Sequence, residues 1–398
     1  MTWRERTLGE GIHIKHGYAF KSKFFSDSGE YIVLTPGNFY EEGGFRFRPS
    51  KDRFYDGDIP EDYILSKDDL IVAMTEQAEG LLGSSALIPQ DNKYLHNQRL
   101  GLLDQIQSDI FDKYFLYYLF NTRSVRYQIS GSASGTKVRH TSPERIYRVS
   151  VKVPDVKTQN KIADILSKYD DLIENNRRRI ELLEESARLL YREWFVHLRF
   201  PSHEHTPFID GIPEGWEIRK IEDICKTIGG GTPSTKNPEY WNDGNITWVT
   251  PTDVTKNNCL ALLDSEKNIT ELGLKKSSAK LVPPETILMT SRASVGFFAL
   301  MDKEICTNQG FISIVPHQEE YRMYLLHNLM YRVEEIRSHA GGSTYREISK
   351  TRFRNFEILI PSKFLLEQFQ DQAYKILQQV RLLNKQNQKL SQARDLLL

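Results

Sequence analysis

The 398-residue chain has no long hydrophobic run, few cysteines and no net charge. Because no stretch approaches 18 consecutive apolar residues, the sequence offers no membrane-spanning helix. The N-terminal MTWRERTLGE does not have the composition of a signal peptide. The three cysteines, Cys225, Cys259 and Cys306, lie far apart in sequence and without metal-ligand spacing. We therefore expect a cytoplasmic protein with reduced thiols and no membrane contact.

Motifs of catalysis and metal binding are also missing. The sequence contains no GxxxxGK[ST], which excludes a P-loop NTPase. In Gly131–Gly135, Ala133 stands where the GxSxG motif requires a serine. His203 and His205 flank a glutamate but lack the HExxH spacing of a metal site. We expect no catalytic residue, no metal and no cofactor in this chain.

The longest regular pattern in the chain is a heptad repeat in Thr158–Phe195, a segment without Pro or Gly. Apolar residues recur there every three or four positions, which predicts one long helix with a coiled-coil partner. The pattern recurs once, near the C-terminus, so we expect the two helices to pair; packing of each helix separately on a globular core is the alternative. Each seam contains an asparagine, a residue that fixes register when buried. The predicted seam consists of Ile162, Leu166, Tyr169, Ile173, Asn176, Ile180 and Leu183 in the first helix and Ile376, Val380, Leu383, Asn387 and Leu390 in the second.

The segments that precede the two helices resemble each other, which indicates a tandem duplication. The spacing is too long for a solenoid and predicts two domains, each followed by a helix. Because the second helix leaves the second domain, its pairing with the first helix makes the two antiparallel, about a pseudo-twofold axis. The first helix would span ~48 Å between Ile162 and Trp194 at ~1.5 Å per residue. The corresponding pairs are Thr35-Pro36 with Thr250-Pro251, Met74-Thr75 with Met289-Thr290, Asn97-Gln98 with Asn308-Gln309, and Gly135–Pro154 with Gly342–Pro361.

We predict an α+β fold: two similar α/β domains are joined by two long helices that form an antiparallel coiled coil, with a pseudo-twofold internal repeat. Within the domains, residues 112–130 and 321–339 are each expected to form one helix, and residues 81–88 and 295–300 a strand. The predicted boundaries are 1–156 for the first domain, 157–199 for the central helix, 200–361 for the second domain and 362–398 for the distal helix.

Positive charge gathers in two equivalent places although the total is balanced. Residues 123–152 contain seven Lys or Arg and one acidic residue, and residues 337–354 contain five and one. Most charge clusters are solvated surface, but the presence of this one in both repeats indicates polyanion binding at two points.

Residues near these basic clusters could bind DNA. A loop of small residues precedes each cluster and could approach phosphates closely, while long polar side chains beside it could reach base edges. For the glutamines, hydrogen bonding to strand edges is the alternative. The candidate DNA-binding residues are Lys137, Arg139, His140, Gln98 and Arg99 in the first repeat and Arg292, Gln309, Ser343, Thr344, Tyr345 and Arg346 in the second.

Over essentially its whole length, the chain resembles the specificity subunit of a Type I restriction-modification enzyme. Gly211–Trp216 (GIPEGW) and the following GGGTPSTKNPEYW and ITWVTPTDV resemble the opening of that family's second target-recognition domain. Thr158–Phe195 resembles the central spacer helix, and LLNKQNQKLSQARDLLL resembles the distal one. No single motif is diagnostic, but their order together with the duplication is specific.

The resemblance implies a non-catalytic subunit in which each target-recognition domain reads one half of a bipartite, asymmetric site in double-stranded DNA. The helices would set the unread gap and dock two methyltransferase subunits, which bring S-adenosylmethionine and methylate adenine. Two motor-nuclease (restriction) subunits, which use ATP with Mg, could join them. Family members often continue beyond the Leu-Leu-Leu with a short Pro- and Gly-containing tail, which leaves open a truncated C-terminus.

Two other functions stay open. A coiled-coil scaffold whose two heads bind protein partners would show no salt-sensitive affinity for DNA. A self-contained DNA enzyme is disfavoured by the missing cofactor and metal motifs. Under the DNA-recognition hypothesis, Arg139→Ala and Arg346→Ala should each weaken one half-site by ~1–3 kcal/mol if each arginine reads a base.

Overall fold

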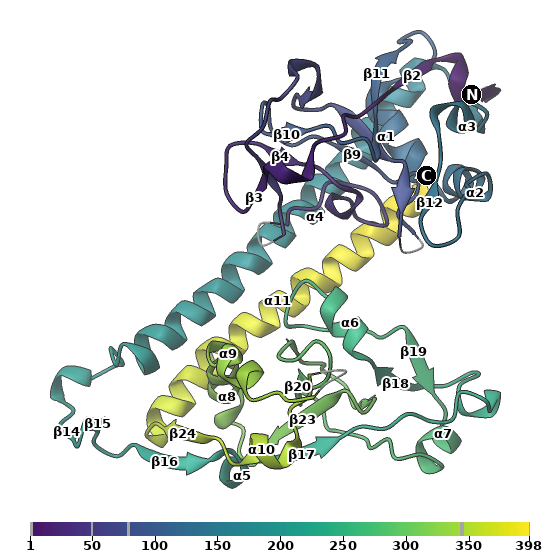
Figure 1. The fold of residues 1–398 in the computed structure, drawn as a ribbon. Helices are drawn as coiled ribbons and strands as arrows, with labels where there is room; N and C mark the ends of the chain where they lie inside the picture. Colours follow the sequence, from purple (N-terminus) through teal and green to yellow (C-terminus); the bar gives the residue numbers. More distant parts are fainter. Residues whose placement is uncertain (1–2, 49–50, 78–79, 343–345, 398) are drawn as a thin grey trace. The chain divides into compact units, whose positions relative to one another are not determined.

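The computed structural model describes residues 3–48, 51–77, 80–342 and 346–397 (Figure 1). The chain divides into two compact units. Unit one comprises Met1–Asp171 with Ser391–Leu398, and unit two comprises Leu172–Leu390. The domain boundaries predicted from the sequence differ from this division because each long helix is shared between the two units. They stay a prediction.

Unit one is built on two small sheets. The first is antiparallel with the order β2-β11-β7-β9, and the second has the order β3-β5-β4-β10-β6. Its short helices are α1 (Lys113–Asn121), α2 (Arg123–Gly131) and α3 (Pro143–Tyr147). Its strands are β1 (Arg4–Thr7), β2 (Ile12–His16), β3 (Phe25–Ser26), β4 (Ile32–Val33), β5 (Phe54–Tyr55), β6 (Ile64–Leu65), β7 (Leu70–Ala73), β8 (Thr75–Glu76), β9 (Ser85–Leu87), β10 (Tyr94–Leu95), β11 (Leu100–Ile106), β12 (Arg139–His140) and β13 (Ser150–Val153).

Unit two repeats this arrangement with sheets of order β17-β23-β20-β21 and β19-β18-β22. Its strands are β14 (Phe208–Ile209), β15 (Ile212–Pro213), β16 (Glu217–Lys220), β17 (Cys225–Gly229), β18 (Ile246–Val249), β19 (Lys267–Ile269), β20 (Ile287–Thr290), β21 (Phe298–Ala299), β22 (Cys306–Thr307), β23 (Phe311–Pro316) and β24 (Glu357–Ile360). Its short helices are α5 (Ile221–Ile224), α6 (Pro251–Lys256), α7 (Glu271–Lys275), α8 (Tyr321–Tyr331), α9 (Val333–Ser338) and α10 (Lys350–Arg354).

Strand register confirms the duplication and corrects one of its predicted correspondences. In unit one Ala73 pairs with Leu100, and in unit two Thr290 pairs with Phe311. Leu100 and Phe311 follow their Asn-Gln pairs at the same distance in sequence, so Ala73 is the equivalent of Thr290. The predicted match of Met74-Thr75 with Met289-Thr290 is therefore wrong by two residues: Met74 corresponds to Ser291.

The strands predicted over residues 81–88 and 295–300 are shorter in the structure, at β9 and β21. Gly83 and Gly296 interrupt them with φ of 79° and 83°, a left-handed conformation that favours glycine. The amide of Gly83 donates to Ala73 O, and that of Gly296 donates to Thr290 O, both at 2.8 Å. Each unit therefore has a tight turn, rather than continuous strand, directly beside its central sheet.

Each predicted domain helix is two helices in the structure. Thr122 is extended, ends α1 and begins α2, where its side-chain oxygen accepts from the amide of Val125. Arg332 likewise separates α8 from α9. A threonine that can cap a helix offers the backbone an alternative to continuing it, and residue periodicity does not reveal such a break.

The long helices are α4 (Val156–Tyr191), which continues as a π-helical turn over Arg192–Val196, and α11 (Lys363–Leu397). They run antiparallel in both units, as predicted. In unit two, the Nδ2 of Asn176 donates to the Oδ1 of Asn387 at 2.9 Å, while Trp194 packs on Phe369 with ring centroids 6.0 Å apart. In unit one, Asp170 pairs with Arg394 at 2.7 Å.

None of the predicted seam residues is fully exposed. The buried ones are Leu166, Ile173, Asn176, Ile180, Val380, Leu383 and Asn387, and the half-buried ones are Ile162, Tyr169, Leu183, Ile376 and Leu390. The Nδ2 of Asn387 in turn donates to Ile173 O at 3.3 Å, so both buried amide nitrogens have a partner, which removes the cost of burying them without one. Over the described residues, no helix has both the length and the apolar stretch that crossing a membrane requires.

Candidate nucleic-acid interface

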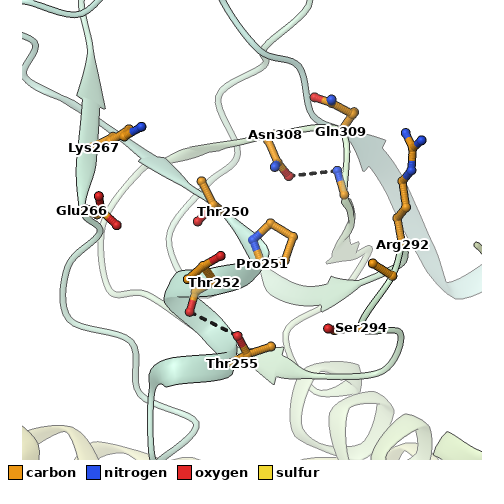
Figure 2. Close-up of a pocket in the computed structure, with 12 residues that line it drawn as sticks. Thr250, Pro251, Thr252, Thr255, Glu266, Lys267, Arg292, Ser294, Asn308 and Gln309 are labelled. Carbon is orange, nitrogen blue, oxygen red and sulfur yellow. Dashed lines mark hydrogen bonds between the residues drawn. The ribbon is translucent and has the colours of Figure 1, made fainter. Parts of the chain in front are cut away.

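Segments that are distant in sequence enclose an open pocket of about 670 Å³ on unit two (Figure 2). The pocket is polar: hydroxyl, amide and charged side chains dominate its lining. Figure 2 shows Arg292 and Gln309 extending from separate loops, with the start of α6 below them. The lining residues are Thr250, Pro251, Thr252, Thr255, Glu266, Lys267, Arg292, Ala293, Ser294, Asn308, Gln309 and Gly310.

The start of α6 is fixed by a capping box. The amide and the hydroxyl of Thr250 both donate to Asp253 Oδ2, at 2.7 and 2.6 Å, and the amide of Asp253 donates to Thr250 Oγ1 at 3.4 Å. Pro251 occupies the first turn, where its fixed φ suits the helix and no amide is needed. Thr35 makes the same arrangement with Asn38 in unit one. The repeated Thr-Pro pair is thus a helix start in both units.

The repeated Asn-Gln pair forms the same turn in both units. The amide of Gly310 donates to Asn308 Oδ1 at 2.9 Å, and the amide of Arg99 donates to Asn97 Oδ1 at 3.0 Å. A side-chain oxygen that accepts from the backbone two residues on is the hallmark of an Asx turn. The turn leaves the following glutamine, Gln98 or Gln309, exposed at its tip. Thr232 Oγ1 donates to Gln309 Oε1 at 2.6 Å and orients that amide.

The loop after β20 carries Arg292, which lines the pocket together with a second cation, Lys267 of β19. Arg292 is exposed, and its Nε lies 3.7 Å from Glu347 Oε2. The amide of Ala293 donates to Arg346 O at 2.9 Å, which joins this loop to the segment before α10. Arg337 Nε donates to Val295 O at 3.0 Å and anchors the loop from the helix side. Arg346 itself is exposed.

The equivalent loop of unit one is held from two sides. The amides of Gly80, Leu81 and Leu82 donate to Glu76 Oε2 at 3.1, 3.0 and 2.8 Å. Arg126 Nε donates to Leu82 O at 2.8 Å, the same contact that Arg337 makes in unit two. Burial lowers the pKa of Arg126, while Glu76 and other acidic residues nearby oppose that effect. Its guanidinium stays charged at neutral pH, because arginine starts from so high a value.

The structure places most of the predicted DNA-binding residues on exposed loops. Arg139 differs, because its Nη1 contacts Glu76 Oε1 at 3.1 Å and its Nη2 donates to Ser130 O and Oγ at 2.5 and 2.9 Å. In this conformation Arg139 does not extend toward solvent as a base reader would. Ser343, Thr344 and Tyr345 lie outside the described residues. The exposed candidates are Gln98, Arg99, Lys137, His140, Arg292, Gln309 and Arg346.

Sequence reasoning missed Glu76, Arg126 and Arg337. Arg126 and Arg337 could have been found, because they are separated by the same number of residues as the repeated Asn97 and Asn308 and so occupy equivalent places in the two repeats. A comparison of the repeats residue by residue would have found them. Glu76 has no counterpart in the other repeat and carried no signal. Among the described residues, the structure contains no group of three or more His, Cys, Asp or Glu side chains arranged to hold a metal ion.

Comparisons with known proteins agree with this arrangement. The family model described as "Type I restriction modification DNA specificity domain" matches residues 1–185 and 213–393. The chain is similar to the type I restriction enzyme MjaIX specificity subunit of Methanocaldococcus jannaschii, with 37% identity over 42% of this chain and 39% of that protein. It is also similar to the HindI specificity subunit of Haemophilus influenzae, with 23% identity over 77% of this chain and 80% of that protein.

A solved structure shares the fold over the whole chain. The S subunit of a type I restriction-modification system from M. genitalium aligns with a TM-score of 0.58 and 15% sequence identity, covering 100% of this chain and 95% of that one. The family model matches each half of the chain once. The chain therefore belongs to the type I restriction-modification DNA specificity family, whose domain it contains twice.

Proposed function

We propose that this chain is the DNA-recognition subunit of a type I restriction-modification complex, and that units one and two each read one half of a bipartite, asymmetric site. The observation that carries the proposal is the repetition of one polar loop frame. Both units combine a capped helix start, an Asx turn with an exposed glutamine, and a glycine turn anchored by arginine. A frame that is kept while its exposed side chains differ suits two readers of different sequences.

The exposed side chains on this frame have the chemistry of base and phosphate recognition. Gln98 and Gln309 present amides, which can pair with adenine, and Arg292 and Arg346 present guanidiniums, which can pair with guanine or phosphate. Lys137 adds a flexible cation in unit one. The catalytic steps then belong to other subunits, which agrees with a non-catalytic role for members of this family.

The long helices supply a surface for those subunits. Besides the buried seam, α4 carries the exposed apolar residues Ile165, Leu172, Leu182 and Leu189. Apolar side chains that recur on the solvent side of a helix indicate an interaction surface. We infer that two methyltransferase subunits dock there and bring S-adenosylmethionine, and that two motor-nuclease subunits with ATP and Mg join in systems that also restrict. Such a complex acts on chromosomal DNA in the cytoplasm.

Methylation mapping tests the proposal. The chain is expressed with the methyltransferase subunit encoded beside it in a host without adenine methylation, and the genome is sequenced for modified adenines. We expect one bipartite motif with a fixed gap, which disappears when this chain is omitted. A contiguous motif, or a motif that persists without the chain, would contradict two-domain reading and favour the protein-binding scaffold.

A further inference from the structure

We propose that Glu76 is a positioning residue of unit one, which holds Arg139 away from DNA and shapes the recognition loop, whereas the equivalent Arg346 of unit two contacts DNA itself. The proposal rests on the function proposed above. It assigns different roles to two arginines that occupy the same place in the repeat.

Glu76 is a buried carboxylate that is fully engaged. Its residue is 4% exposed. One oxygen, Oε2, accepts from three successive backbone amides of Gly80, Leu81 and Leu82, and the other accepts from Arg139. A buried charge without such partners is strongly destabilising. The Glu76 carboxylate therefore holds the backbone amides of the loop and, at the same time, the guanidinium of Arg139.

The other faces of the loop and of Arg139 are also occupied. Arg126 binds the loop from its carbonyl side, donating to Leu82 O, to Gly80 O and, at 3.0 Å, to Glu41 O. Arg139 ends on Ser130 at the end of α2. Extending Arg139 to DNA would break the contacts to Ser130 and the ion pair with the buried Glu76. Such a side chain acts on recognition through the loop it holds.

In unit two an arginine still binds the glycine turn, but the contact between Glu76 and Arg139, which we call the clamp, has no equivalent among the described residues there. In unit one, Glu76 of β8 pairs with Arg139 of β12. In unit two, Ala293 takes the place of Glu76, and its amide donates to the carbonyl oxygen of Arg346. Alanine offers no carboxylate, and within the described part of the chain the Arg346 guanidinium has no hydrogen bond or ion pair. Arg337 still anchors the loop through Val295 O. An exposed guanidinium above an anchored loop can contact phosphate or a base edge.

The salt dependence of binding separates the two roles. Log affinity falls as log salt concentration rises, because each phosphate contact releases counterions from the DNA. Removal of a side chain that contacts phosphate therefore makes this negative slope shallower by about 0.9. Removal of a positioning residue lowers affinity without changing that slope. The measurement uses the full chain in complex with its methyltransferase subunits, on a duplex that carries the mapped site, by fluorescence anisotropy over a salt series.

We expect R346A to lower affinity roughly tenfold or more and to reduce the slope by about 0.9. We expect R139A to lower affinity with an unchanged slope. E76Q should have a similar effect, and the double variant E76Q/R139A should be no worse than either single one, because both act through one clamp. K67A is the matched control: Lys67 is exposed and precedes β7, whereas Glu76 follows it, so its removal should leave both quantities unchanged.

Several outcomes would overturn the inference. A reduced slope in R139A, or a further loss when R139A is added to E76Q, would show that Arg139 contacts DNA directly. An unchanged affinity together with an unchanged slope in R346A would remove the DNA contact assigned to unit two. If R139A does not fold, R139Q keeps a hydrogen-bond donor toward Ser130 and serves the same comparison. Absence of salt-sensitive specific binding by the wild-type complex would overturn the proposed function and this inference together, and is seen before any substitution.

Discussion

Unit one and unit two share a loop frame and differ in what it holds. Arg126 and Arg337 make the same contact to the carbonyl of the glycine turn, at 2.8 and 3.0 Å. Beyond that anchor, unit one fills its loop with the buried Glu76, and unit two has Ala293 there. Backbone geometry has been retained through the duplication, while the charges on it have not.

The difference shows how two copies of one fold can recognise different ligands. The anchors are hydrogen bonds from side chains to backbone, which do not depend on the identity of the loop's own side chains. Loop side chains are therefore free to change without loss of the turn. Equivalent positions in the repeats cannot be given equivalent roles until their partners are known, as Arg139 and Arg346 illustrate.

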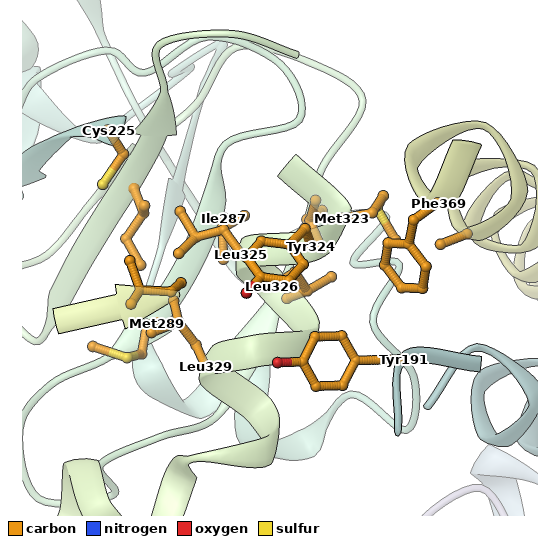
Figure 3. Packing of buried hydrophobic residues seen from close by; sticks show 14 of the residues in the cluster. Tyr191, Cys225, Ile287, Met289, Met323, Tyr324, Leu325, Leu326, Leu329 and Phe369 are labelled. Carbon is orange, nitrogen blue, oxygen red and sulfur yellow. The ribbon is translucent and has the colours of Figure 1, made fainter. Parts of the chain in front are cut away.

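The largest expected difference between the units lies where each long helix enters its core. Phe369 of α11 is fully buried, and the ring of Tyr191 lies 6.1 Å from it (Figure 3). The rings of Trp194 and Phe195 lie at 6.0 and 5.1 Å. Phe369→Ala should destabilise unit two by about 3–5 kcal/mol, because removal of the buried ring leaves a cavity in the core. Its counterpart Ile162 is only half-buried, so Ile162→Ala should cost unit one about 1–2 kcal/mol.

Hydrogen–deuterium exchange measures these losses separately, on the amides of α8 for unit two and of α1 for unit one. The unmutated unit in each variant is the internal control. Equal losses in the two units would contradict the asymmetry in packing.

Ion pairs on α11 should rank next. Arg381 Nη2 donates to Glu285 Oε2 at 2.9 Å, its Nη1 lies 2.8 Å from Glu285 Oε1, and both side chains are largely buried. Glu285→Ala should cost about 3–4 kcal/mol, because it leaves the buried charge of Arg381 with Asp302, 3.8 Å from its Nε, as the remaining ion-pair partner among the described residues. In unit one, Asp170→Ala should cost about 1–2 kcal/mol, since Arg394 keeps Asp395 at 3.0 Å.

Chemical denaturation, with each transition assigned by exchange, measures both changes. Addition of Arg381→Met to Glu285→Ala should restore most of the loss, because it removes the unpaired charge. A double variant as unstable as the single one would show that the Glu285 side chain contributes through packing instead.

Acid should destabilise both units through one buried histidine each. Burial lowers the pKa of His96 in unit one and of His327 in unit two from 6.5 to about 4. Between these two pKa values the unfolded chain binds the proton more readily than the folded chain. The contribution of each histidine to the free energy of unfolding is therefore fully present above pH 6.5 and is lost as the pH falls toward 4. Each histidine should contribute up to about 3 kcal/mol over that window.

Urea midpoints between pH 4 and 7 test this in the wild type and in His96→Gln and His327→Gln. Each substitution should flatten the pH dependence of its own unit by about 1.4 kcal/mol per pH unit. A slope that neither substitution changes would assign acid sensitivity to the carboxylates.

The smallest difference is expected at the two capped helix starts. Thr250→Ala should cost about 1 kcal/mol and Thr35→Ala about 0.5–1 kcal/mol, because Thr250 shares its capping box with a carboxylate and Thr35 with an amide. Methylation mapping with each variant should show weakened recognition of one half-site only. Loss at both half-sites from either variant would contradict independent reading by the two units.

Features with a local cause were predictable from the sequence. The heptad pattern of Thr158–Phe195 identifies α4 to within a few residues, because a helical seam repeats every three or four positions. Thr158 also takes part in a local cap, where its amide donates to Asp155 Oδ1 at 3.0 Å. The duplication was visible because Thr-Pro and Asn-Gln serve the same backbone turns in both copies.

Register and loop contacts were not predictable in this way. The predicted match of Met74 with Met289 was displaced by two residues, because the Met-Thr pair happens to recur in the sequence. The equivalent residues are determined instead by the pairing of β7 with β11 and of β20 with β23. The helix break at Thr122 depends on whether a side chain caps the backbone or points to solvent. Neither choice leaves a periodic trace in the sequence.

The sequence by itself determined that this protein has two copies of one domain, two long antiparallel helices and no recognisable catalytic motif. Only the tertiary structure decided which of two equivalent arginines is held and which is exposed. Glu76 and Arg139 are 63 residues apart, and the short ladder of β8 and β12 brings them together. The partner of a charged side chain is set by such non-local pairing, whereas a helix or a repeat is set by residues near one another in the chain.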